Sequence, residues 1–215
     1  YTRKINHFAL FFIPLFIDII LPVQPSIDLM IIGSFVAVAG LTIYIKRIRC
    51  NSRLIQRMFL SFDRPEDRPN TLLWLSTQIT AGYLILLPII IYFYSIGYGN
   101  LILIPILVNG IGDGLAEPVG IRFGRLKYKT YALFSKIKYE RTIEGSACVF
   151  FTSVIVIIFF KSGFTSPEFI CLLMMFPIVM TLAEAFAPHT WDTPFLFIFG
   201  YLTLYFVKIM PFVTH

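Results

Sequence analysis

The chain has 215 residues, of which 57% are hydrophobic and only 14% charged, and its formal net charge is +6. Soluble domains carry about 25% charged residues, and disordered chains have few apolar residues, so neither class fits this composition. The sequence therefore predicts an all-α, polytopic integral membrane protein. Its basic residues flank apolar runs, which indicates membrane topology and anionic headgroups rather than nucleic acid.

Seven apolar runs approach the length of a membrane-spanning helix, which needs about 20 residues to cross about 30 Å of hydrocarbon. They occupy residues 6–23, 28–46, 72–95, 100–120, 146–161, 168–188 and 194–212. Pro14 and Asp18 interrupt the first run. Continuous rather than alternating hydrophobicity favours a helical bundle over a β-barrel. We expect one transmembrane domain over residues 1–215, with two spans in 1–46, a basic amphipathic linker in 47–71 and five spans in 72–215.

The basic residues set the expected orientation. With seven spans, every Lys and Arg except Lys161 and Lys208 lies on one side of the membrane. The positive-inside rule then predicts that the N-terminus and this basic side face the cytoplasm or its equivalent. Arg49, Arg53 and Arg57 recur at every fourth residue, which predicts a short interfacial amphipathic helix. This helix either sets topology alone or also binds lipid headgroups or phosphate.

An acidic pair lies in the fourth span, where charge is costly and usually functional. Asp113 and Glu117 are one helical turn apart, so they repel each other unless one is protonated or a divalent cation neutralises both. Oxygen ligands that leave room for substrate phosphates suit Mg²⁺. Nearby glycines allow either a closely bound ligand or close helix packing: Gly110, Gly112, Gly114, Gly120 and Gly124. Pro118 should break or kink the helix.

A basic loop follows the fourth span, on the membrane face that holds the acidic pair. Lys136, Lys138 and Arg141 are suited to neutralise a polyphosphate. Thr142 or Ser146 is expected to cap the next helix, whose first free amides would bind phosphate. A loop that only sets topology is the alternative.

A second acidic segment, from Glu184 to Asp192, joins the last two spans. In the seven-span arrangement it lies on the same side as the basic loop, although it contains no Lys or Arg. His189 is expected to orient Asp192 or a substrate. Three polar segments are therefore expected to converge on one membrane face.

Together these segments resemble the CTP-dependent polyprenol kinase family, which includes dolichol kinase, phytol kinase and fungal diacylglycerol kinase, with phosphatidate cytidylyltransferase as a distant relative. Gly112-Asp113-x-x-Ala116-x-x-x-Gly120-x-x-x-Gly124 is similar to the family's glycine–aspartate motif. Arg141-Thr142-Ile143-Glu144-Gly145-Ser146 is similar to its Lys-Ser/Thr-x-Glu-Gly-Ser/Thr motif, with arginine in place of lysine. Glu184 to Asp192 is similar to its closing acidic motif, where Thr193 replaces a common asparagine.

The resemblance implies CTP as the phosphoryl donor and a lipid alcohol, such as polyprenol, phytol or diacylglycerol, as the acceptor. The implied Mg²⁺ ligands are Asp113, Glu117 and Asp192. Arg141 would also be catalytic, and Glu184 or Asp192 would orient the acceptor hydroxyl. The residues implied to bind CTP are Gly112, Gly114, Lys136, Lys138, Arg141, Thr142, Glu144, Gly145 and Ser146. A phosphatidate cytidylyltransferase and a catalytically silent subunit of a larger membrane complex stay open as alternatives, as does a homo-oligomer.

Overall fold

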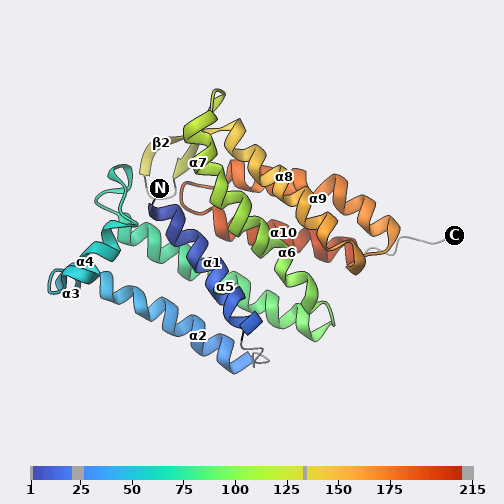
Figure 1. Cartoon of the computed structure of the whole chain (residues 1–215), viewed down its shortest axis with the longest axis horizontal. Coiled ribbons are helices and arrows are strands. Elements are labelled where there is room, and N and C mark those ends of the chain that lie inside the picture. Colours follow the sequence, from blue (N-terminus) through green and yellow to red (C-terminus); the bar gives the residue numbers. More distant parts are fainter. Residues whose placement is uncertain (1, 21–26, 133–134, 210–215) are drawn as a thin grey trace. The chain divides into compact units, whose positions relative to one another are not determined.

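The computed structural model describes residues 2–20, 27–132 and 135–209 (Figure 1). The chain divides into two compact units, Tyr1–Pro88 and Ile89–His215. Helices dominate both units, so the predicted all-α class is confirmed, apart from one β-hairpin in the second unit.

Within the described residues, each predicted span coincides with a helical segment. These segments are α1 (Thr2–Ile20), α2 (Ile27–Gly40) with η1 (Leu41–Tyr44), α5 (Thr71–Ser95), the run of η3 (Gly99–Ile102), α6 (Leu103–Leu107), η4 (Val108–Asp113) and α7 (Gly114–Phe123), then α8 (Ile143–Phe159), α9 (Ser166–Phe186) and α10 (Asp192–Ile209). Four segments are long and apolar enough to cross a membrane: Ile27–Tyr44, Thr71–Ser95, Gly99–Phe123 and Ser166–Phe186. Pro14 and Asp18 do not end α1, and their side chains lie outside the described residues.

The first unit contains the amphipathic linker, which also includes η2 (Pro65–Asp67). It forms two short helices, α3 (Lys46–Arg49) and α4 (Arg53–Leu60), rather than the one continuous helix that the arginine spacing predicts. Ser52 separates them because its hydroxyl accepts the Ile55 N–H as the N-cap of α4. The Arg49 guanidinium lies 3.7 Å from the centroid of the buried Phe59 ring, which fixes the turn between the helices.

The second unit is a helical bundle in which α8 packs against α7 and α9, and α9 packs against α10. Its core is formed by fully buried apolar side chains: Val149, Ile157, Leu172, Phe176, Met180, Leu196 and Leu204. Lys208 pairs with Glu168 at 2.9 Å, and this joins the end of α10 to the start of α9. The opposite ends of these two helices are joined by a tight turn at residues 187–191, where Thr190 has a φ of 68°.

The expected break at Pro118 does not occur, because α7 continues through this residue to Phe123. The irregularity lies earlier, where η4 is a π-helix that ends at Asp113. A π-helical turn inside an α-helix is rare and is frequently found at functional sites. The distortion therefore coincides with the first acidic residue of the predicted motif.

The basic loop between α7 and α8 is a two-stranded antiparallel hairpin, β1 (Lys127–Ala132) and β2 (Ser135–Thr142). The strands pair Tyr128 with Arg141 and Lys129 with Glu140. Successive side chains on a strand point to opposite faces, so every second residue shares a face. The alternation of lysine with tyrosine and threonine along β1 is typical of a strand. The dense positive charge of the same segment instead led to the prediction of a loop that sets membrane topology.

Candidate functional site

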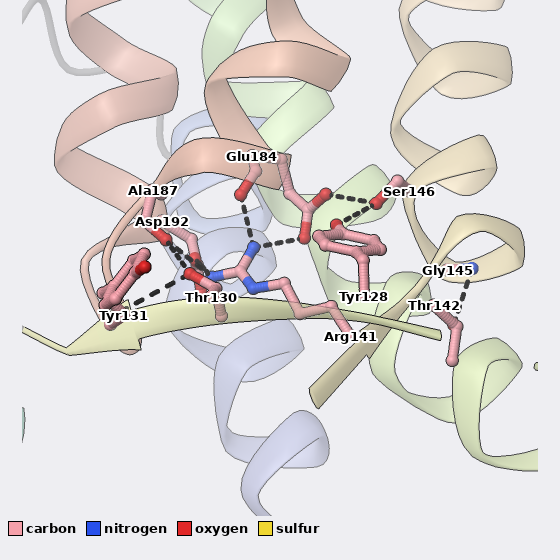
Figure 2. Close-up of polar contacts among 10 residues, drawn as sticks. All are labelled: Tyr128, Thr130, Tyr131, Arg141, Thr142, Gly145, Ser146, Glu184, Ala187 and Asp192. Carbon is pink, nitrogen blue, oxygen red and sulfur yellow. Dashed lines mark hydrogen bonds and ion pairs between the residues drawn. The ribbon is translucent and has the colours of Figure 1, made fainter. Parts of the chain in front are cut away.

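Arg141 joins the hairpin to the end of α9 and the start of α10 (Figure 2). Its Nη1 donates to the Glu184 carboxylate at 2.5 Å and also to the Glu184 carbonyl oxygen. Its Nη2 donates to the Ala187 carbonyl at 3.3 Å and to Oδ1 of Asp192. One guanidinium therefore binds two carboxylates from two helices, with only 13% of its side chain exposed.

A hydrogen-bond chain reaches the same carboxylate from the opposite direction (Figure 2). Ser146 Oγ donates to Glu184 Oε2 at 2.7 Å, and the Tyr128 hydroxyl lies 2.7 Å from Ser146 Oγ. The single Ser146 proton is used by the carboxylate, so the Tyr128 O–H must donate to Ser146. Burial raises the pKa of Tyr128, which keeps the phenol protonated for this bond. Tyr128 is a site residue that the sequence reasoning missed, although strand alternation was a signal for it.

The cluster carries more negative than positive charge. Burial alone would lower the pKa of Arg141, but Asp192 and Glu184 outweigh it and raise the pKa, so the guanidinium stays charged. Glu184 also interacts electrostatically with Asp113, which is buried at the end of η4. Two carboxylates thus bind one guanidinium at the end of an apolar bundle, and this excess negative charge favours a further cation.

The two carboxylates bound to Arg141 differ in their remaining capacity. Both oxygens of Glu184 accept hydrogen bonds, from Arg141 and from Ser146. Among the described residues, Asp192 accepts through Oδ1 alone, which leaves its Oδ2 able to accept another donor. The Asp192 side chain is also more exposed than that of Glu184, at 15% against 6%.

The predicted magnesium ligands are divided between two places. Asp113 and the half-buried Glu117 lie one turn apart on η4 and α7, whereas Asp192 is held by Arg141. Across the described part of the chain, no three His, Cys, Asp or Glu side chains are grouped to hold a metal ion. Mg²⁺ commonly uses only one or two protein carboxylates when substrate phosphates supply the other oxygens. Asp113 and Glu117 therefore match the number of protein carboxylates that such an ion uses, and the magnesium site stays a prediction.

The glycines of the first motif allow α7 and α8 to approach closely. A Cβ added at Gly112 would lie 3.1 Å from the Val149 Cα, and one at Gly145 would lie 2.7 Å from the Ala116 carbonyl oxygen. Gly120 and Gly124 face Thr142 in the same way. Gly114 is buried at the start of α7. Close helix packing, the alternative to ligand binding, is thus a physical role for several of these glycines.

The residues expected to bind triphosphate around the start of α8 make bonds within the chain. Thr142 caps the helix as predicted, accepting the Gly145 N–H at 3.1 Å, so this amide is not free for phosphate. The Glu144 carboxylate accepts the Arg125 N–H at 2.8 Å and the Leu126 N–H at 3.3 Å. These contacts hold the hairpin entrance against α8.

The basic residues of the hairpin do not act together. Lys138 is exposed, and its Nζ lies 5.1 Å over the Tyr131 ring, while strand alternation directs it away from the face that carries Arg141. The Lys136 side chain lies outside the described residues. Of the two cations whose side chains are described, Arg141 lies on the inner face and Lys138 on the other, so these two do not act together on one polyphosphate in this geometry.

His189 locks the hairpin onto the turn between α9 and α10. Its ring stacks on Tyr139 with a centroid distance of 3.5 Å, and its backbone N–H donates to the Tyr131 carbonyl at 2.6 Å. Thr130 Oγ1 donates to the Ala187 carbonyl at 3.0 Å beside it. In this geometry His189 positions the hairpin, and its expected role in orienting Asp192 or a substrate stays a prediction.

No protein-family model, curated protein or solved structure matches the chain. The residues and geometry of the site therefore carry the functional case by themselves.

Proposed function

We propose that this chain is an integral-membrane lipid kinase that transfers a phosphoryl group from CTP to a lipid alcohol. The observation that carries the proposal is the convergence of two distant segments: Arg141 and Ser146 both bind Glu184, and Arg141 binds Asp192. These are the segments that resemble polyprenol kinase motifs. Buried ion pairs contribute little net stability compared with apolar packing, so a cluster of this kind favours a functional role.

The excess negative charge supports a complex of a metal ion with a nucleotide, rather than a bare nucleotide, as the ligand. In the proposal Asp113 and Glu117 would hold Mg²⁺ on the triphosphate, and Arg141 would hold Glu184 and Asp192 beside the phosphoryl oxygens. When bound, the Mg²⁺ neutralises charge on the phosphates of CTP. The nucleotide would bind on the membrane face shared by the hairpin and the N-terminus, which the positive-inside rule places on the cytoplasmic-equivalent side.

The difference between Glu184 and Asp192 supports a choice of the acceptor-binding residue. Asp192 Oδ2 has a lone pair to offer, whereas both Glu184 oxygens are bound. Asp192 would therefore accept the proton of the lipid hydroxyl while the hydroxyl oxygen of the lipid forms a bond to the γ-phosphorus of CTP. The bond from that phosphorus to the β-phosphate oxygen breaks, and CDP leaves. Glu184 and Tyr128 would keep Arg141 and Ser146 in place.

Labelled CTP gives the decisive test. The purified chain is incubated with γ-labelled or cytidine-labelled CTP and Mg²⁺, against a panel of prenols, phytol, diacylglycerol and phosphatidate. We expect the γ-label in an extractable lipid phosphate. The cytidine label in lipid would instead identify a cytidylyltransferase, because attack would then occur at the α-phosphorus.

Asp113→Asn tests the assignment of the acidic pair. We expect it to lower turnover by at least about 100-fold, because loss of a charge that stabilises the phosphoryl transition state commonly costs this much. Asp28→Asn, at an exposed position in the first turn of α2, is the matched control and should retain activity. Equal turnover by Asp113→Asn and the wild type would show that the metal assignment is wrong.

A structural subunit of a larger membrane complex is the second candidate function. The hydrogen bonds of Arg141 favour it, because both Nη atoms already have acceptors within the chain. Each Arg141 Nη atom binds a carboxylate and a carbonyl, which is sufficient for a purely structural clamp. A ligand that binds only the folded state raises its melting temperature. Stabilisation by CTP with Mg²⁺, but not by CTP with a chelator, would support the kinase, and no stabilisation by either would support the structural subunit.

A further inference from the structure

We propose that the outward face of the β1–β2 hairpin lies against the headgroups of anionic phospholipids at the membrane border. We define the hairpin surface as the outward-facing strand residues Lys127, Lys129 and Lys138 together with two exposed apolar side chains beside them: Leu126, which precedes β1, and Tyr131, which lies at the register shift of the strands. The inference concerns residues outside the acidic cluster and is independent of which reaction the cluster performs.

Strand geometry separates these lysines from the candidate site. Tyr128 and Thr130 face inward, since they bond to Ser146 and to the Ala187 carbonyl. Lys127 and Lys129 alternate with them and therefore point to the other face. The Lys127 Nζ confirms this direction by pairing at 2.9 Å with Glu140, on the adjacent strand. These cations thus do not neutralise the carboxylates around Arg141.

The hairpin surface begins where an apolar helix ends. The candidate span Gly99–Phe123 finishes three residues before Leu126. A segment that directly follows a membrane-spanning helix lies at the level of the lipid headgroups. Arg122 and Arg125, both exposed, occupy the connection and add positive charge next to the lysines.

The surface mixes cations with exposed apolar side chains, as membrane-interfacial segments do. Leu126 is 61% exposed and Tyr131 is 68% exposed, while the Lys138 Nζ lies 5.1 Å over the Tyr131 ring. A soluble phosphate ligand requires the cations alone and gains nothing from exposed leucine and tyrosine. An anionic lipid surface uses both, because the lysines attract headgroups and the apolar groups enter the interface.

Fluorescence quenching in bilayers tests the inference directly. A Tyr131→Trp variant of the full chain is reconstituted into phosphatidylcholine that contains brominated phosphatidylglycerol or brominated phosphatidylcholine, and the signal of Trp74 and Trp191 is subtracted using the wild type. We expect the anionic quencher to associate with position 131 about fivefold or more tightly, the effect of roughly one cation at a charged membrane surface. The preference should fall at high salt. Equal quenching by both lipids, or quenching by neither, would overturn the proposal.

Charge removal identifies the residues responsible. In the Tyr131→Trp background, Lys127→Gln, Lys129→Gln and Lys138→Gln together should lower the preference several-fold, toward the residual preference set by Arg122 and Arg125. The matched control removes three cations from the first basic segment, by Lys46→Gln, Arg47→Gln and Arg53→Gln, and should keep the preference. A hairpin triple variant that retains its lipid preference contradicts the inference. So does one that loses affinity for CTP with Mg²⁺ at unchanged lipid preference, since the lysines would then belong to a nucleotide site.

Discussion

Arg141 illustrates how one side chain can organise a site at the residue scale. Its Nη atoms bind two carboxylates and two carbonyl oxygens that come from the end of α9, the following turn and the start of α10. Arginine suits this position because its planar, permanently charged group donates in several fixed directions. A lysine would present a single charged nitrogen. An Arg141→Lys change would therefore affect geometry more than charge.

Removal of the Arg141 guanidinium should lower the free energy of unfolding. Arg141→Met leaves Glu184 and Asp192 without their cation, and breaking a buried ion pair typically costs about 3–5 kcal/mol. Thermal unfolding of the purified chain in detergent measures the effect. Arg122→Met, at an exposed position, is the control and should change stability by less than about 0.5 kcal/mol.

A variant that also neutralises the two carboxylates shows whether the instability of Arg141→Met comes from unpaired buried charge or from lost packing and hydrogen bonds. Arg141→Met combined with Glu184→Gln and Asp192→Asn should recover most of the lost stability, because no buried charge is then left without a partner. If the single and the triple variants are equally unstable, the loss comes from packing or hydrogen bonding rather than from charge.

At the scale of elements, close contact between α7 and α8 determines where the hairpin can begin. Thr142 is both the last residue of β2 and the N-cap of α8, and Gly120 and Gly124 make room for its side chain. Gly145 then packs against the Ala116 carbonyl. β2 and α8 therefore meet at a junction beside α7, where the short distances between backbones leave room only for small residues.

Gly145→Ala tests this junction. The added methyl group would lie 2.7 Å from the Ala116 carbonyl oxygen, so α7 and α8 must move apart. We expect a loss of about 1–3 kcal/mol in unfolding free energy, as in other overpacked cores. Gly33→Ala is the matched control: nothing lies within 4 Å of its added Cβ, and helix propensity predicts equal or higher stability. Unchanged stability in Gly145→Ala would show that the close contact is not needed.

At the scale of the whole molecule, the basic segments predict a common side for distant parts of the chain. Within the first unit, Arg3 near the N-terminus pairs with Asp67 of the linker at 3.6 Å. Within the second unit, the hairpin contacts the turn between α9 and α10. Each contact joins segments that the seven-span arrangement assigns to one membrane side, so the local contacts agree with the charge argument.

Cysteine labelling in sealed vesicles checks the sidedness of the whole chain. In variants that each carry one cysteine, the exposed native Cys50 and Lys129→Cys should react with a membrane-impermeant maleimide from the same side. Lys161→Cys, in the connection between α8 and α9, should react only from the other side. Reaction of all three from one side would contradict the seven-span topology.

The sequence by itself determined the helical class and the approximate position of the apolar helices, four of which are long and apolar enough to cross a membrane among the described residues, because long apolar runs require helices whatever their neighbours. It also indicated the Thr142 cap, since capping depends only on residues a few positions away. It singled out Asp113, Glu184 and Asp192 as candidates through their charge in or beside apolar runs, and Arg141 as a cation of the basic loop. It did not indicate the hairpin. The alternation of residues in 127–132 is short, and the many basic residues there indicated a topology-setting loop instead.

Only the tertiary structure decided what those charged residues contact. Whether Arg141 meets phosphate or carboxylate depends on the path of a strand that brings it to α9 and α10, more than 40 residues away in the chain. The same path turns Lys138 outward and brings Tyr128 and Ser146 to Glu184. A side chain's direction on a strand reverses with each residue, so a topology drawn from charge alone cannot specify these partners.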